Sequence, residues 1–74
     1  MPIRILIADD SPSVRKTIRQ LLQYSGWQIL EAENGLQAIS QALELHPEIV
    51  VLDLAMPGMD GLAVARQIHN RLPE

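Results

Sequence analysis

Short aliphatic segments alternate with longer amphipathic ones along this chain of 74 residues. Residues 3–8 and 48–53 are rich in Ile, Leu and Val, and residues 27–32 alternate apolar with polar side chains, as strands do. Residues 11–26, 34–47 and 61–73 repeat apolar side chains at helical spacing. Three βα units in succession predict an α/β fold with a parallel sheet and right-handed crossovers.

Capping residues mark the ends of the expected helices. Ser11 can act as the N-cap of the first helix with Pro12 at its first position, and Gly26 fits the position after its end. Asn34 can cap the second helix, and Pro47 ends it. The side chains expected to face inward are Val14, Ile18, Leu21 and Leu22 in the first helix, Leu36, Ile39, Ala42 and Leu43 in the second, and Leu62, Ala65, Ile68 and Leu72 in the third.

Composition excludes several classes of protein. The chain has no cysteine, so it holds no disulfide and no thiolate metal site. Its net charge of −3 has the wrong sign for a nucleic-acid-binding face. No apolar stretch approaches the length that spans a bilayer, and the N-terminus does not resemble a signal peptide. We therefore expect a cytoplasmic domain that binds neither nucleic acid nor membrane directly.

Three acids follow the strands of this predicted sheet. Asp9 and Asp10 come directly after the first strand, and Asp53 ends the third. The carboxyl ends of parallel strands lie at one edge, so these carboxylates should converge there and need a counter-charge. Oxygen ligands without Cys or His favour Mg²⁺ or Mn²⁺. The alternative is that each acid only caps a helix.

Two other phosphate chemistries fit less well. The segment ADDSPS at residues 8–13 has no glycine and two negative charges, unlike a loop that binds nucleotide phosphates. An aspartyl-nucleophile phosphatase of the haloacid dehalogenase family would have Asp-x-Asp after its first strand, where this chain has Asp-Asp.

The segments ILIADD at residues 5–10 and VVLDLAMPGMDG at residues 50–61 closely resemble the receiver domain of two-component response regulators. The resemblance covers all 74 residues and corresponds to the first three of the family's five βα units. It implies a flavodoxin-like fold with strand order 2-1-3 and a sensor histidine kinase as phosphoryl donor. It also implies that Asp53 is the phosphoacceptor. The implied metal ligands are Asp10 directly, Asp9 mostly through water, Asp53, and the backbone carbonyl of Ala55.

The family pattern continues beyond these residues, so we expect residues 1–74 to be the N-terminal part of a receiver domain. The family's Ser/Thr after its fourth strand and Lys after its fifth have no counterpart here, and the chain's one lysine is Lys16. Phosphorylation is therefore expected to be impaired, and the chain is not an enzyme in the turnover sense. Arg15, Lys16 and Arg19 on the first helix are either a kinase-docking face or a solvated surface.

A second functional hypothesis comes from the third strand. In the family's strand order this strand is central, whereas here residues 49–53 would form an apolar edge. Two copies could pair these edges antiparallel in a homodimer with strand order 2-1-3-3′-1′-2′. The alternative geometry is pairing through exposed helix faces, with the strand edges left apart. The alternative function is accordingly a self-associating receiver fragment, natural, proteolysed or engineered, that transfers no phosphate.

Overall fold

The computed structural model describes residues 2–53 and 61–71. Strands β1 (Arg4–Ala8), β2 (Gln28–Ala32) and β3 (Ile49–Leu52) alternate with helices α1 (Pro12–Leu21), α2 (Gly35–Leu45) and α3 (Gly61–Arg71). All strand pairs are parallel, and the order in the sheet is β2-β1-β3. The structure therefore confirms the predicted α/β fold and strand order.

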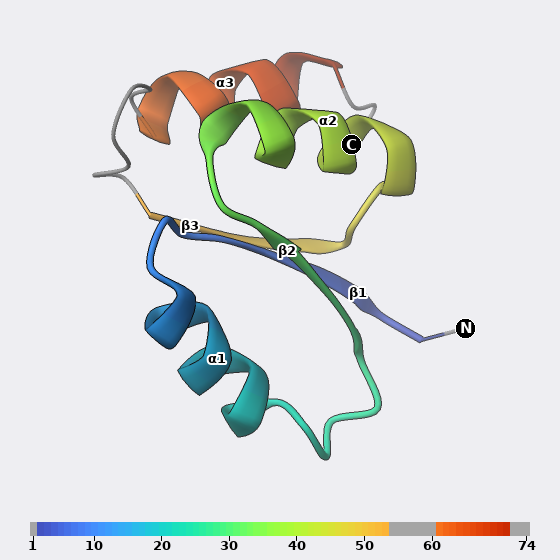
Figure 1. The fold of residues 1–74 in the computed structure, drawn as a ribbon. Coiled ribbons are helices and arrows are strands. Elements are labelled where there is room, and N and C mark those ends of the chain that lie inside the picture. Colours follow the sequence, from blue (N-terminus) through green and yellow to red (C-terminus); the bar gives the residue numbers. More distant parts are fainter. Residues whose placement is uncertain (1, 54–60, 72–74) are drawn as a thin grey trace.

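The helices divide unequally between the two faces of the sheet. Figure 1 shows α2 and α3 side by side over one face and α1 alone on the other. Alternate residues of a strand point to opposite faces, so Leu6 and Ala8 of β1 face α2 and α3, while Ile5 and Ile7 face α1. None of the helices within the described ranges is both long and apolar enough to cross a bilayer.

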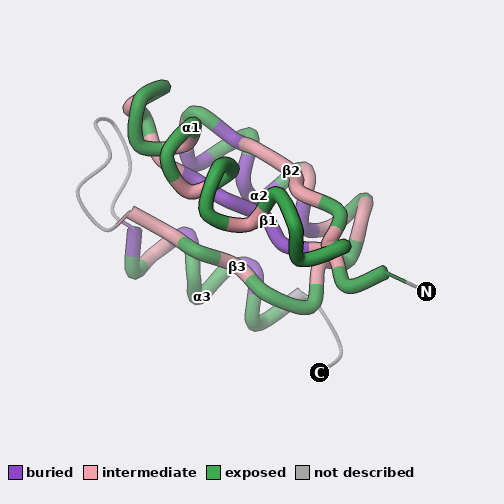
Figure 2. The backbone as a smooth tube through the Cα atoms, turned by 90° about the horizontal axis from the view of Figure 1, so that it is seen from below, coloured by how far each residue is buried: buried purple, intermediate pink, exposed green. Residues whose placement is uncertain are grey.

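The core lies between the central strand and the helix pair. Leu6, Ala38, Ala42 and Val64 are each 0% exposed and belong to one hydrophobic cluster. In contrast α1, which is described over its whole length, buries none of its residues, and Figure 2 shows it as exposed or intermediate throughout. The α2–α3 face therefore supplies most of the hydrophobic stabilisation.

Local capping follows the sequence closely, with one exception. The Ser11 Oγ accepts the N–H of Val14 at 3.3 Å, and the Asn34 Oδ1 accepts the N–H of Gln37 at 2.9 Å. The prediction for Gly26 was wrong, because α1 already ends at Leu21. Gly26 has a φ of +79° and instead turns the chain towards β2.

Several predictions of inward-facing side chains were also wrong. Five of those residues are exposed, namely Val14, Leu21, Leu36, Leu62 and Ala65. The buried residues of α2 are Gly35, Ala38, Ile39 and Ala42, so the predicted Ile39 and Ala42 do face the core, and α3 buries Val64 together with the predicted Ile68. The core-facing side of each of these two helices therefore coincides only in part with the predicted apolar stripe. Leu72 lies outside the described residues.

This assignment of faces predicts that the same substitution, Leu→Ala, lowers the free energy of unfolding by different amounts at a buried and at an exposed position. Leu6→Ala removes a fully buried side chain and should lower the free energy of unfolding by about 2–5 kcal/mol. Leu36→Ala removes the same atoms from a residue that is 72% exposed, and should change it by less than about 0.5 kcal/mol. Urea unfolding followed by circular dichroism measures both. A large cost at Leu36 would contradict the observed face of α2.

Candidate functional site

The register of the sheet brings the predicted acids to one edge. Ala8 of β1 is the Cα partner of both Ala32 and Leu52, so the chain leaves all three strands at the same level. The N–H of Asp53 donates to the Ala8 carbonyl at 2.9 Å, and the N–H of Asp9 donates to the Ala32 carbonyl at 3.1 Å. These bonds hold both backbones where the strands end.

The carboxylates of Asp9, Asp10 and Asp53 come together at this edge. One carboxylate oxygen from each lies within 4.8 Å of the other two. Asp9 and Asp53 are half-buried and Asp10 is exposed, so the cluster is open to solvent on one side. Three negative charges this close repel one another unless a cation lies between them.

The donor set matches a hard divalent cation. Among the described residues, the potential metal ligands of the cluster are carboxylate oxygens, which Mg²⁺ and Mn²⁺ prefer. The remaining predicted ligand, the carbonyl of Ala55, lies outside the described residues. The three predicted carboxylate ligands therefore lie together in space.

The turn between β1 and α1 orients the first of these acids. The Oδ1 of Asp9 accepts the N–H of Ser11 at 2.9 Å. Ser11 in turn caps α1 through its side chain, and its carbonyl accepts the N–H of Arg15 at 3.1 Å. The start of the helix and the Asp9 carboxylate are therefore fixed by the same short segment.

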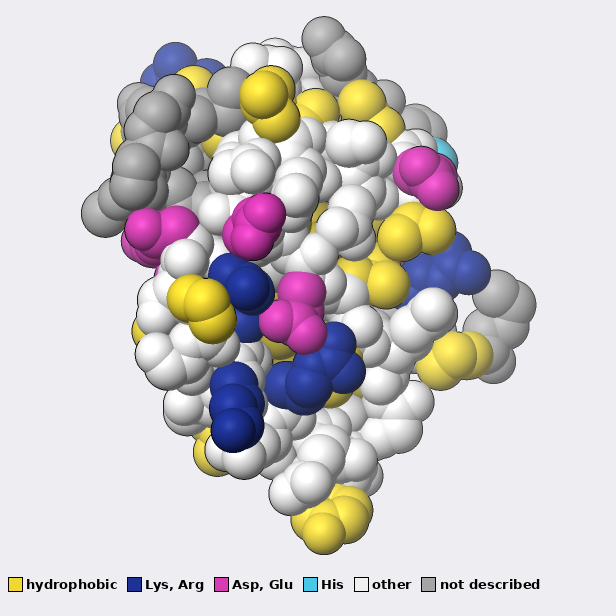
Figure 3. Space-filling view, in the orientation of Figure 1, with side chains coloured by type: hydrophobic (Ala, Val, Ile, Leu, Met, Phe, Trp, Pro, Cys, Tyr) yellow, Lys and Arg dark blue, Asp and Glu magenta, His cyan; other side chains and the backbone are white. Residues whose placement is uncertain are grey.

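Basic side chains of α1 surround a carboxylate of β2. The Nε of Arg15 lies 3.1 Å from Oε1 of Glu31, and the Nη2 of Arg19 lies 2.6 Å from Oε2. Figure 3 shows Lys and Arg side chains gathered around acidic ones over this face. Glu31 was not singled out in the sequence. Strand alternation could have found it, since it places Glu31 with Ile29 on the face towards α1.

These contacts change the acidity of Glu31. Hydrogen bonding to Arg19 holds the pKa of the Glu31 carboxyl below its ordinary value of 4.5, and Arg15 contributes in the same direction. Partial desolvation opposes this shift in pKa but is the smaller effect. Glu31 is therefore an ionised partner of both arginines at neutral pH.

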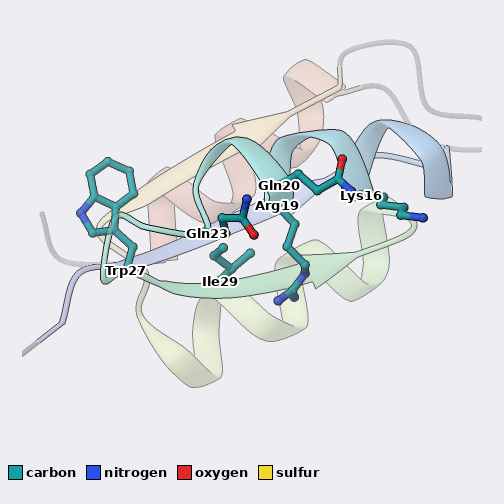
Figure 4. A pocket seen from close by; sticks show the side chains of 6 residues that line it. All are labelled: Lys16, Arg19, Gln20, Gln23, Trp27 and Ile29. Carbon is teal, nitrogen blue, oxygen red and sulfur yellow. The ribbon is translucent and has the colours of Figure 1, made fainter.

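The described residues form two open grooves that the three acids do not line. One, of about 500 Å³, runs between α1 and β2 and is lined by Lys16, Arg19, Gln20, Gln23, Trp27 and Ile29. Figure 4 shows Trp27 at one end and Lys16 at the other, so its aromatic and cationic groups do not converge. The second, of about 250 Å³, is lined by Val50, Leu52, Ala65, Ile68 and His69, and is mainly apolar.

A family model described as the response regulator receiver domain matches residues 5–74. The chain belongs to the response regulator receiver family. It is 40% identical over 70 residues to the response regulator MprA of Mycobacterium sp. (strain KMS), covering 95% of this chain and 30% of MprA. It is 45% identical over 71 residues to a protein-glutamate methylesterase/protein-glutamine glutaminase of Myxococcus xanthus, covering 93% of this chain and 20% of that protein.

Solved structures share the fold as well. The response regulator TrrA of Thermotoga maritima, crystallised in complex with Mg²⁺-BeF, has a TM-score of 0.86 and 40% identity, covering 92% of this chain and 59% of TrrA. The three-stranded arrangement thus matches the flavodoxin-like fold of receiver domains. The chain spans less than a third of the length of the curated relatives.

The lowered pKa of Glu31 predicts a pH-dependent contribution to stability. A carboxyl with a depressed folded-state pKa stabilises the fold above its ordinary pKa, and this contribution is lost as the pH falls through the lowered value. The difference in unfolding free energy between the wild type and Glu31→Gln should therefore be largest above pH 4.5 and shrink below it. Urea unfolding between about pH 3 and 7 measures this difference. Glu44→Gln, at an exposed residue of α2, controls for the change in net charge. A difference that grows on acidification would contradict the ion pair.

Proposed function

We propose that this receiver accepts a phosphoryl group on Asp53 from a histidine kinase. The observation that carries the proposal is the convergence of Asp9, Asp10 and Asp53 within 4.8 Å, in a chain of the receiver family. The Mg²⁺-BeF complex of TrrA supports a magnesium site in a related protein. The proposed ligands of Mg²⁺ or Mn²⁺ are these three carboxylates and the carbonyl of Ala55.

The chemistry follows from the position of Asp53. One carboxylate oxygen attacks the phosphorus of a phosphohistidine, the new O–P bond forms an acyl phosphate, and the P–N bond to the donor imidazole breaks. The electron pair of that bond stays on the imidazole nitrogen, which takes up a proton. Bound Mg²⁺ would offset the repulsion between the attacking carboxylate and the phosphoryl oxygens. The 2.9 Å bond from the Asp53 N–H to Ala8 keeps the nucleophile at the end of its strand.

The remaining parts of the function rest on the family resemblance. The chain carries a signal by being modified and turns over no substrate, although some relatives couple a receiver to an esterase. We assign kinase docking to the basic residues of α1, of which Lys16 and Arg19 are exposed and Arg15 is mostly buried. We place this exchange in the cytoplasm.

Phosphorylation provides the direct test. Incubation with a small phosphodonor and Mg²⁺ should give an adduct of one phosphoryl mass, detected by intact-mass spectrometry. It should disappear in Asp53→Asn and on removal of Mg²⁺. An adduct that persists in Asp53→Asn would contradict the assignment.

A second function, self-association, is favoured by the surface of β3. This strand is at the edge of the described sheet, and Ile49 and Val51 are 36% and 40% exposed. On the opposite face, Val50 and Leu52 line the apolar groove beside α3. We propose that two copies of the chain pair these edges, because an exposed apolar edge strand is a template for further pairing.

The sheet register selects the variant that tests this pairing. The N–H of Asp53 points to β1, and backbone N–H groups alternate along a strand, so the N–H of Val50 points to the outer edge. Val50→Pro should remove one edge donor and shift a dimer to monomer, whereas Val50→Ala keeps that donor and should stay dimeric. Sedimentation at micromolar concentration measures whether each variant is a dimer or a monomer. A folded wild-type monomer, or a dimer unaffected by Val50→Pro, would contradict the edge model.

A further inference from the structure

We propose that Arg15, anchored by Glu31, is a positioning residue of the acidic site. The guanidinium of Arg15 spans two elements at once. Its Nη1 donates to the carbonyl of Asp9 at 2.6 Å, and its Nε donates to Glu31 of β2 at 3.1 Å. The proposal rests on the proposed function, since it concerns the cation site of Asp9, Asp10 and Asp53.

The burial of Arg15 distinguishes it from the other basic residues of α1. Its side chain is 13% exposed, whereas that of Arg19 is 48% exposed. A guanidinium withdrawn this far from water needs fixed partners, and its planar fork holds two acceptors in one geometry. Arg19 occupies the other oxygen of Glu31, through Nε at 2.8 Å, and so holds that carboxylate in place.

The bond to Asp9 acts on the next residue as well. The Asp9 carbonyl belongs to the planar peptide group that joins Asp9 to Asp10, so fixing its oxygen fixes the plane of that group. The 3.1 Å bond from the Asp9 N–H to Ala32 holds the preceding peptide. The position of the Asp10 Cα, from which its carboxylate extends, is therefore set between β2 and Arg15.

Whether removal of Arg15 weakens or strengthens cation binding distinguishes a positioning role from a direct electrostatic one. A guanidinium beside a cation site repels the incoming cation, so its charge alone opposes metal binding. Removing Arg15 would then strengthen binding if charge dominated. If positioning dominates, removing Arg15 weakens binding, as loss of an outer-shell partner of a metal ligand does.

The test compares two arginines that share one carboxylate. Arg15→Met loses the bonds to Glu31 and to Asp9, whereas the matched control Arg19→Met loses only a partner of Glu31. We expect Arg15→Met to weaken Mn²⁺ binding about tenfold and Arg19→Met to change it less than about twofold. Calorimetry gives the affinity, and Mn²⁺ broadening of backbone amide resonances at Asp9, Asp10 and Asp53 gives the location. Without metal, amide exchange at Ser11 should speed up in Arg15→Met alone.

The outcomes are distinguishable. Unchanged or tighter Mn²⁺ binding by Arg15→Met overturns the positioning role, provided that the wild type binds and that Asp10→Asn with Asp53→Asn abolishes the broadening. Broadening that survives this double variant overturns the metal site itself, and the role of Arg15 with it. If Arg15→Met does not fold, Arg15→Lys keeps the charge but loses the two-point bond. It should bind Mn²⁺ more weakly by about threefold, and unchanged binding would contradict the proposal.

Discussion

The parallel pairing of β1 with both of its neighbours is the constraint on which the site depends. Ala8 pairs with Ala32 on one side and with Leu52 on the other, so three strands end at one level. An antiparallel β3 would carry Asp53 to the opposite edge, far from Asp9. Backbone hydrogen bonds at the strand ends therefore bring three carboxylates together, at a cost in repulsion that the hydrophobic core has to offset.

The two faces of the sheet stabilise the strand ends, where the three carboxylates repel one another, by different interactions. Over one face, α2 and α3 bury small and branched side chains against β1, and this face provides a rigid base for the strand ends. Over the other, α1 buries no residue and is tied to the sheet by Arg15 and Arg19 on Glu31. On this second face the hydrogen bond from Arg15 fixes the orientation of the peptide group that follows Asp9. Apolar contacts have no preferred direction and could not do this.

Family membership and the geometry support one another at different levels. The family match and the neighbouring structures establish the receiver fold, while the distances among the acids show that the three carboxylates lie together. The apolar side chains of β3 belong to neither argument. Ile49 and Val51 are exposed, and they support only the proposed self-association.

The sequence by itself determined the elements, their order and the acids, because these depend on local signals: aliphatic runs for strands, Ser11 and Asn34 for helix starts, and carboxylates directly after strands. It did not determine which residues the helices bury. Leu36 and Leu62 lie within the predicted apolar stripes, yet close packing turned Ala38 and Val64 inward instead. Only the tertiary structure decided that Arg15 reaches both Asp9 and Glu31. Asp9 is 6 positions from Arg15 in the chain and Glu31 is 16 positions away, so both contacts depend on how α1 packs against the sheet. Local signals specify what a segment becomes, whereas contacts between segments depend on how closely and at what angle they pack.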